Sequence, residues 1–210
     1  VRGFPEYVRR VQQRHWDRSN DLPIRLRGKT MGIIGLGRTG TATAMRARAF
    51  GLQVIFYDPY VYDGYDKAIG LERVETLEEI ANRSHIVSFH TPLTDETNKM
   101  FDQQFVDMLA NDIILLNGAR GAIIDIDVLE SAMRLGKVKA AGLDVLPIEP
   151  NSDEQKLITA WEKQEDWIRD RLIVTPHVAF YSPEGYVEMR TKAALEAKRV
   201  LDGQKARNPV

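Results

Sequence analysis

The feature that most constrains this chain is a glycine-rich segment, GLGRTG, between a short apolar run and an alanine-rich run. Its three glycines, Gly35, Gly37 and Gly40, form a GxGxxG pattern. The first permits a tight turn, the second lets a pyrophosphate approach the backbone, and the third lets a helix pack closely on a strand. Free N–H groups at the start of such a helix attract phosphate. The segment predicts a strand–turn–helix unit that binds a dinucleotide; the alternative is a glycine turn that binds nothing.

An acidic residue lies where such a unit needs one. Asp58 follows the apolar segment 53–57 and stands 23 residues after Gly35, close to the spacing of about 20 expected for a carboxylate that binds an adenosine ribose. That carboxylate accepts hydrogen bonds from a ribose diol and repels a 2′-phosphate. We therefore expect NAD rather than NADP. The alternative is that Asp58 only caps the turn before Pro59.

Apolar runs and helix-forming runs alternate along most of the chain. We expect strands over residues 30–34, 53–57, 86–89, 113–116, 140–145 and 172–175. We expect helices over residues 4–15, 38–50, 76–83, 102–109 and 127–135, and from Ser182 onward. Apolar strands that alternate with helices predict a parallel sheet covered on both faces, which is a Rossmann-type doubly wound α/β fold.

Composition removes several classes of protein. The 210 residues include no Cys, which excludes disulfides, Cys-based metal sites and thiol nucleophiles. We predict no metal site. The net charge of −1 carries no electrostatic signature of direct nucleic-acid binding, and no apolar run approaches the roughly 18 residues of a membrane span. A chain without Cys fits a reducing compartment, and we expect a cytoplasmic location.

Three polar residues follow expected strands, at the sheet edge where α/β proteins gather their ligands: Arg120, Glu149 and His177. The guanidinium offers a planar fork for a carboxylate, the imidazole exchanges a proton with an oxygen at C2, and the carboxylate holds the imidazole. Taken singly, they also fit a surface arginine, a turn glutamate and a helix-start histidine. Together they predict reversible hydride chemistry on a 2-oxo or 2-hydroxy acid.

Five segments in order resemble the D-isomer-specific 2-hydroxyacid dehydrogenases: GLGRTG, FYDPY, RGAIID, AAGLDVLPIEP and TPHVAFYS. FYDPY, TPHVAFYS and EMRTKAALEA are most similar to the subgroup of C-terminal-binding proteins. The resemblance covers about residues 28–201. It implies that Arg120 binds substrate, that His177 is the acid/base, and that Glu149 pairs with His177.

The same resemblance implies contacts to NAD. They fall on Arg38 and Thr39 at the pyrophosphate; Asp58, Pro59 and Tyr60 at the adenosine; Thr91, Pro92 and Thr97 flanking the cleft; and Gly118, Ala119 and Asp144 at the nicotinamide. Gly118 departs from the family, which usually has Thr, Ser or Val there, so a side-chain contact is lost.

The resemblance also implies a domain organisation. Residues 1–27 are expected to form an interdomain helix and linker, 28–181 an NAD-binding Rossmann domain, and 182–210 a C-terminal helix that returns toward a substrate domain. Residues 151–171 look like an insertion, a surface excursion anchored by Trp161 and Trp167. We therefore expect the cofactor domain of a two-domain protein whose substrate domain is largely absent, paired as a homodimer.

Two kinds of function fit these expectations. The first is an NAD-dependent oxidoreductase that transfers a hydride between nicotinamide and C2 of a 2-oxo or D-2-hydroxy acid. The alternative is a non-enzymatic NAD(H)-sensing scaffold or corepressor that resembles C-terminal-binding protein, which keeps the same polar trio. A dinucleotide-binding regulatory domain is a third possibility.

Overall fold

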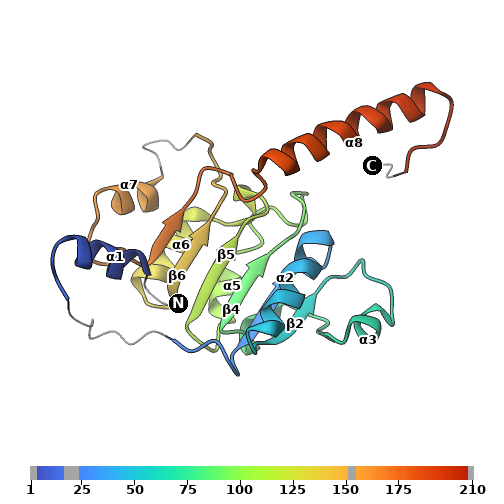
Figure 1. Cartoon of the computed structure of the whole chain (residues 1–210). Coiled ribbons are helices and arrows are strands. Elements are labelled where there is room, and N and C mark those ends of the chain that lie inside the picture. The colour runs from blue at the N-terminus through green and yellow to red at the C-terminus, as the bar shows by residue number, and fades with distance from the viewer. Residues whose placement is uncertain (1–3, 17–23, 151–154, 208–210) are drawn as a thin grey trace. The chain divides into compact units, whose positions relative to one another are not determined.

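The computed structural model describes residues 4–16, 24–150 and 155–207. Within them, seven parallel strands form one sheet in the order β3-β2-β1-β4-β5-β6-β7 (Figure 1). The strands are β1 (Thr30–Ile34), β2 (Gln53–Tyr57), β3 (Glu72–Arg73), β4 (Ile86–Phe89), β5 (Ile113–Asn117), β6 (Val138–Leu143) and β7 (Leu172–Val174). This confirms the predicted Rossmann-type sheet. The strand order reverses between β1 and β4, which is where such folds bind their ligands.

Helices connect the strands, and their caps follow from the sequence. They are α1 (Phe4–Gln12), α2 (Arg38–Ala49), α3 (Tyr65–Ile69), α4 (Leu77–Arg83), α5 (Gln103–Asp107), α6 (Ile126–Arg134), α7 (Lys156–Glu162) and α8 (Pro183–Leu201). Thr76 and Glu79 form the capping box that starts α4, and the Ser182 hydroxyl accepts the Gly185 N–H at the start of α8. Each cap replaces backbone hydrogen bonds that the first turn of a helix lacks.

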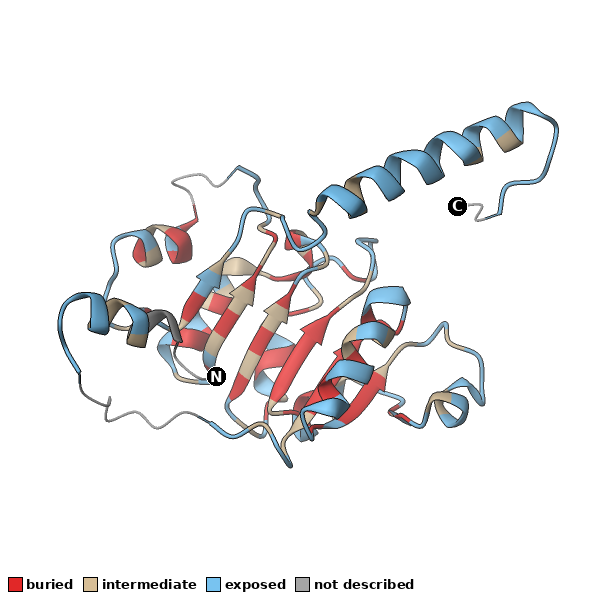
Figure 2. Cartoon of the chain, viewed as in Figure 1, coloured by how far each residue is buried: buried red, intermediate tan, exposed pale blue. Residues whose placement is uncertain are grey.

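The core lies on both faces of β1, whose successive side chains point in opposite directions. Ile33 packs in a smaller apolar cluster with Ala44 and Ala47 of α2. Ile34 packs in a larger cluster that includes α4, α5 and α6. Figure 2 shows the central strands as the most buried part of the sheet.

The other half of the sheet is covered less evenly than the apolar run 113–116 predicts. Ile114 and Leu116 of β5 are only half-buried, and Ile173 of β7 is 54% exposed. An apolar groove of about 500 Å³ runs over β5, β6 and β7 on the side of the sheet that α2 covers elsewhere. Among the described residues, this face of the sheet is therefore less buried than the face that packs on α5 and α6.

The segment expected to be a surface excursion contributes to the core. Residues 151–154 lie outside the described part, but α7 follows them and packs on α6. Leu157, Ile158 and Ile168 are buried in the larger apolar cluster, whereas Trp161 and Trp167 are only partly buried. Both tryptophans pack against the same cluster, so they and the aliphatic residues together hold the segment on the domain, and its origin as an insertion stays a prediction.

The chain divides into two units, residues 1–176 and 177–210, whose positions relative to one another are not determined. The division falls five residues before the expected boundary at 181/182. The second unit contains α8, of which no described residue is buried.

Candidate functional site

The glycine loop connects β1 to α2. Gly35 has a φ of +89°, and a Cβ there would lie 2.9 Å from the backbone at His90 and Thr91. A Cβ on Gly40 would lie 2.1 Å from the Gly35 carbonyl oxygen. Both positions therefore require glycine for the fold alone.

Gly37 differs from its two neighbours. It caps α2 with a φ of −71°, which any residue can adopt, and a Cβ there would meet no protein atom within 4 Å. The first turn of α2 contains no acid, and no side chain caps it, so the partial positive charge at the start of the helix favours an anion. The free space over Gly37 fits a phosphate group.

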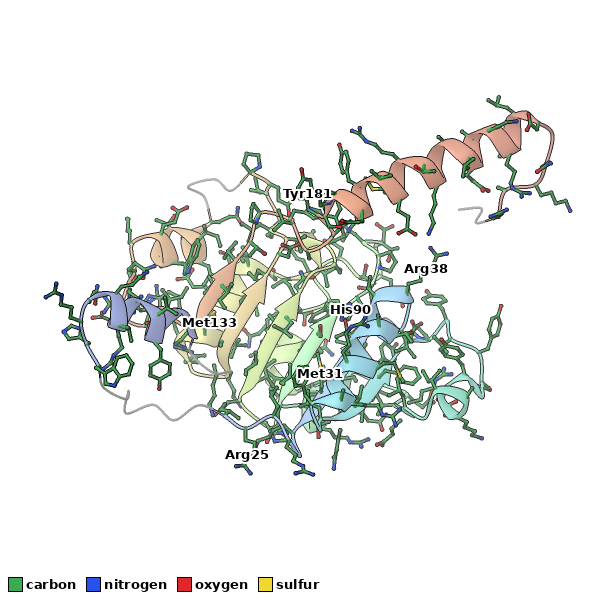
Figure 3. All side chains as sticks on the ribbon, viewed as in Figure 1. Arg25, Met31, Arg38, His90, Met133 and Tyr181 are labelled. Carbon is green, nitrogen blue, oxygen red and sulfur yellow. The ribbon has the colours of Figure 1, made fainter. Side chains whose placement is uncertain are left out.

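Further side chains surround this loop. Arg38 and Thr39 are exposed at the first turn of α2; Figure 3 shows Arg38 there and His90 at the carboxyl end of β4. Among the described residues, the buried Thr91 hydroxyl has no hydrogen-bond partner. An orphaned polar atom beside the loop calls for a partner from outside the chain, such as an ordered water or a ligand.

Asp58 follows β2, and both of its carboxylate oxygens accept backbone N–H groups. Oδ2 accepts from Leu36 of the glycine loop at 2.7 Å, and Oδ1 accepts from Tyr60 at 2.9 Å. Asp58 thus caps its own turn and also ties β2 to the loop after β1. Each oxygen retains a second lone pair for a ribose hydroxyl. A ribose role for Asp58 stays a prediction.

Two loops flank the space beyond Asp58. The Tyr60 hydroxyl donates to Glu96 Oε2 at 2.5 Å, and this hydrogen bond raises the pKa of Tyr60 above its usual value. Thr97 is buried, and its hydroxyl donates to the Pro92 carbonyl at 2.6 Å, so it organises its own loop. Sequence reasoning missed Glu96, because nothing local distinguishes it from other surface acids.

His90 lies beneath the glycine loop, with its Cβ 3.4 Å from the position of a Cβ on Gly40. Its Nε2 is 2.9 Å from the Ser88 hydroxyl, and burial lowers its pKa from the usual 6.5 to about 4. The ring is therefore neutral at pH 7 and packs within the fold.

We expect His90 to make the fold sensitive to acid. The unfolded chain binds a proton on this histidine at higher pH than the folded chain, so its contribution to stability is lost as the pH falls from 6.5 toward 4. In urea titrations across this range, His90→Gln should show a shallower decline in the free energy of unfolding than the parent chain. His15→Gln, at an exposed position, is the matched control. Parallel declines for parent and His90→Gln would contradict this assignment.

The loop after β5 carries Arg120 and is organised by a buried asparagine that sequence reasoning missed. Asn117 donates from Nδ2 to the Arg120 carbonyl at 2.9 Å and accepts the Ala119 N–H on Oδ1 at 3.0 Å. An asparagine that ends an apolar strand is the signal that identifies such a turn. Arg120 is exposed, and its Nη1 donates to the Ala119 carbonyl at 2.7 Å. Gly118 is exposed beside it, with open space at its Cβ position.

A close backbone approach joins this loop to the one after β6. A Cβ on Gly121 would lie 2.0 Å from the Leu146 carbonyl, so the turn that carries Arg120 contacts the segment that leads to Glu149. Glu149 Oε1 accepts the Leu146 N–H at 2.9 Å. Asp144 Oδ1 accepts the Thr175 hydroxyl at 2.5 Å, which links the ends of β6 and β7. These loops gather at one edge of the sheet.

His177 begins the second unit, with a φ of +53°. Left-handed backbone is uncommon for residues other than glycine and often marks a functional position. Its ring meets Phe180 edge to face, with 5.9 Å between centroids. Because the two units are not placed relative to one another, the pairing of Glu149 with His177 stays a prediction.

Within the described residues, no group of three or more potential ligands could hold a metal ion, and no helix has the length and apolarity to cross a bilayer.

Comparisons with known sequences find related proteins. The family model described as "D-isomer specific 2-hydroxyacid dehydrogenase, NAD binding domain" matches residues 1–179. D-3-phosphoglycerate dehydrogenase of Methanocaldococcus jannaschii is 34% identical over 210 residues, which is 100% of this chain and 38% of that protein. C-terminal-binding protein 1 of Caenorhabditis elegans is 36% identical over 183 residues, which is 86% of this chain and 24% of that protein.

A solved structure gives the same result for the fold. The crystal structure of D-lactate dehydrogenase from Aquifex aeolicus, complexed with NAD and lactic acid, superposes with a TM-score of 0.80 at 29% identity. The match covers 97% of this chain and 62% of that one. The chain therefore spans less than two thirds of each of these three relatives.

Proposed function

Because the chain belongs to the D-isomer-specific 2-hydroxyacid dehydrogenases, as their NAD-binding domain, we propose that it binds NAD(H) and serves hydride transfer to and from C2 of a 2-oxo or D-2-hydroxy acid. The observation that carries the proposal is the open space at Gly37. Close packing gives no reason for the absence of a side chain there, whereas a pyrophosphate on the start of α2 does. NAD, when bound, supplies the hydride acceptor or donor.

The residues where the strand order reverses, between β1 and β4, would hold the cofactor. The N–H groups near Gly37, with Arg38 and Thr39, face the pyrophosphate, and Asp58 accepts from the adenosine ribose. Thr91 offers its unpartnered hydroxyl. The remaining positions line the two ends of the cleft: Pro59 and Tyr60 at the adenosine, Pro92 and Thr97 beside it, and Gly118, Ala119 and Asp144 toward the nicotinamide.

Three side chains would act on the substrate. The Arg120 guanidinium holds its carboxylate through two parallel hydrogen bonds. His177 gives a proton to the C2 oxygen in reduction and removes it in oxidation, and Glu149 orients the ring and favours the imidazolium. The family provides the roles, and the meeting of the β5 and β6 loops at Gly121 supports the grouping of Arg120 with Glu149.

A second candidate function is an NAD(H)-sensing scaffold. It is favoured by the 36% identity to C-terminal-binding protein 1 of C. elegans. Turnover of simple 2-oxo acids by the whole protein would support the enzyme. Weak turnover together with assembly that depends on NADH would support the scaffold. A cytoplasmic location belongs to the same proposal, in keeping with the lack of Cys, and cell fractionation tests it.

Cofactor choice tests the proposed function most directly. We expect the chain to bind NADH at least about tenfold more tightly than NADPH, because the Asp58 carboxylate repels a 2′-phosphate. Asp58→Asn should reduce this preference for NADH, since it removes the negative charge and keeps one acceptor oxygen for the backbone N–H groups. Calorimetric titration with both dinucleotides measures the ratio. Equal or tighter binding of NADPH by the parent chain would contradict the proposal.

We also propose a homodimer built on this domain. The apolar groove over β5–β7 is a surface that a second copy would cover. Light scattering at tens of micromolar should give twice the 23.9 kDa of one chain. Ile173→Lys, within the groove, should shift the mass toward one chain, whereas Leu135→Lys, exposed elsewhere, should not. A monomeric parent chain would count against this proposal.

A further inference from the structure

The Tyr60–Glu96 hydrogen bond lies across the adenosine end of the proposed site. β2 and β4 are the two neighbours of β1 in the sheet. Tyr60 follows β2, and Glu96 lies in the loop after β4. Their contact at 2.5 Å therefore links the loops on either side of the glycine loop.

Both partners are held in position independently of each other. The Tyr60 N–H donates to Asp58 Oδ1, so the position of the tyrosine is set by the turn that Asp58 itself caps. Glu96 occupies a turn in which the Thr97 hydroxyl accepts the Thr94 N–H at 2.8 Å. Glu96 is exposed, as is 77% of Tyr60, so water reaches the pair and a ligand can reach it too.

We propose, resting on the proposed NAD(H) site, that Glu96 is a specificity-determining residue for the adenosine ribose and that Tyr60 is its positioning residue. Held by Tyr60, the Glu96 carboxylate adds a second negative charge beside Asp58. A dinucleotide without a 2′-phosphate meets two acceptors, whereas one with a 2′-phosphate meets two like charges.

The size of the effect follows from solvent exposure. Charges in water attract and repel weakly, and at physiological ionic strength the screening length is about 8 Å. We therefore expect Glu96 to change the ratio of NADPH to NADH dissociation constants by about three- to tenfold at low salt, and by less at high salt. Asp58, which lies closer to the glycine loop, should have the larger effect.

The test compares five proteins in titrations with NADH and with NADPH: the parent chain, Glu96→Gln, Tyr60→Phe, the double variant of these two, and Asp95→Asn. Glu96→Gln removes the charge and keeps an acceptor for Tyr60. Tyr60→Phe keeps the ring and releases Glu96. Asp95→Asn removes an equal charge from the neighbouring exposed position in the same loop. Glu96→Gln and Tyr60→Phe should each lower the ratio of the NADPH dissociation constant to the NADH dissociation constant. The double variant should lower this ratio no further than either single variant, and Asp95→Asn should lower it less.

Two results would overturn the inference while the proposed function stands. One is an unchanged ratio in Glu96→Gln in a parent chain that prefers NADH. The other is an equal fall in Asp95→Asn, which would assign the effect to general surface charge. Failure of the parent chain to bind either dinucleotide would overturn the proposed function and this inference with it.

Discussion

Replacing His177 with alanine in the whole protein should slow both 2-oxo acid reduction and 2-hydroxy acid oxidation by about 10²–10⁴-fold, the usual contribution of a general acid/base. The loss should be in kcat, because the imidazole acts on the C2 oxygen in the transition state. NADH binding should change little. Steady-state rates in both directions and an NADH titration provide the measurement, with His15→Ala as the exposed histidine control.

Companion variants separate the roles within the trio. Arg120→Ala should raise KM as well as lower kcat, because Arg120 holds the substrate carboxylate in the ground state too. Glu149→Gln should move the pH profile of reduction to lower pH, because reduction needs the protonated imidazole and the carboxylate favours that form. A His177→Ala protein with unchanged rates would remove the acid/base assignment. An unshifted profile in Glu149→Gln would remove the pairing.

The second large effect is expected in the glycine loop, where two substitutions should each weaken NADH binding, for different physical reasons. Gly40→Ala drives a methyl group to within 2.1 Å of the Gly35 carbonyl oxygen. The loop must shift, which should destabilise the fold by about 1–3 kcal/mol or more and abolish detectable NADH binding. Gly37→Ala meets no protein atom and has an ordinary φ, so it should lower the free energy of unfolding by only about 0.5–1 kcal/mol, the cost of alanine in place of glycine at a helix N-cap.

Gly37→Ala should nevertheless weaken NADH binding by about 10- to 100-fold, because the methyl group occupies the space in which we propose that the pyrophosphate sits. Urea unfolding and NADH fluorescence titration measure the two quantities on the same proteins. Tight NADH binding by Gly37→Ala would contradict the phosphate site at the start of α2. Parent-like stability in Gly40→Ala would contradict the steric argument.

Local physical chemistry explains why much of the fold was readable from the sequence. Apolar runs such as 30–34 and 86–89 became strands, and Thr76 and Ser182 became helix caps, because these signals act over a few neighbouring residues. The glycine loop was readable for the same reason. The short β3 and α3 were missed, since two strand residues and one helical turn carry too little pattern.

Local sequence patterns did not predict which segments, distant in the sequence, contact each other in the fold. The apolar residues of 155–168 entered the core and Ile173 stayed exposed, because burial depends on which helix packs over which strand. Nothing in the sequence around Gly121 predicted its contact with Leu146, and nothing around Tyr60 predicted its hydrogen bond with Glu96.

The sequence by itself determined the longer helices and strands, the glycine loop and the acid after the second strand, since backbone propensity, turn chemistry and capping are properties of adjacent residues. Only the tertiary structure decided that Asp58 binds the glycine loop, that Gly121 brings the loops after β5 and β6 into contact, and that Glu96 stands opposite Tyr60. Those contacts depend on the order and register of parallel strands, which residues far apart in the chain set together through the burial of their apolar faces.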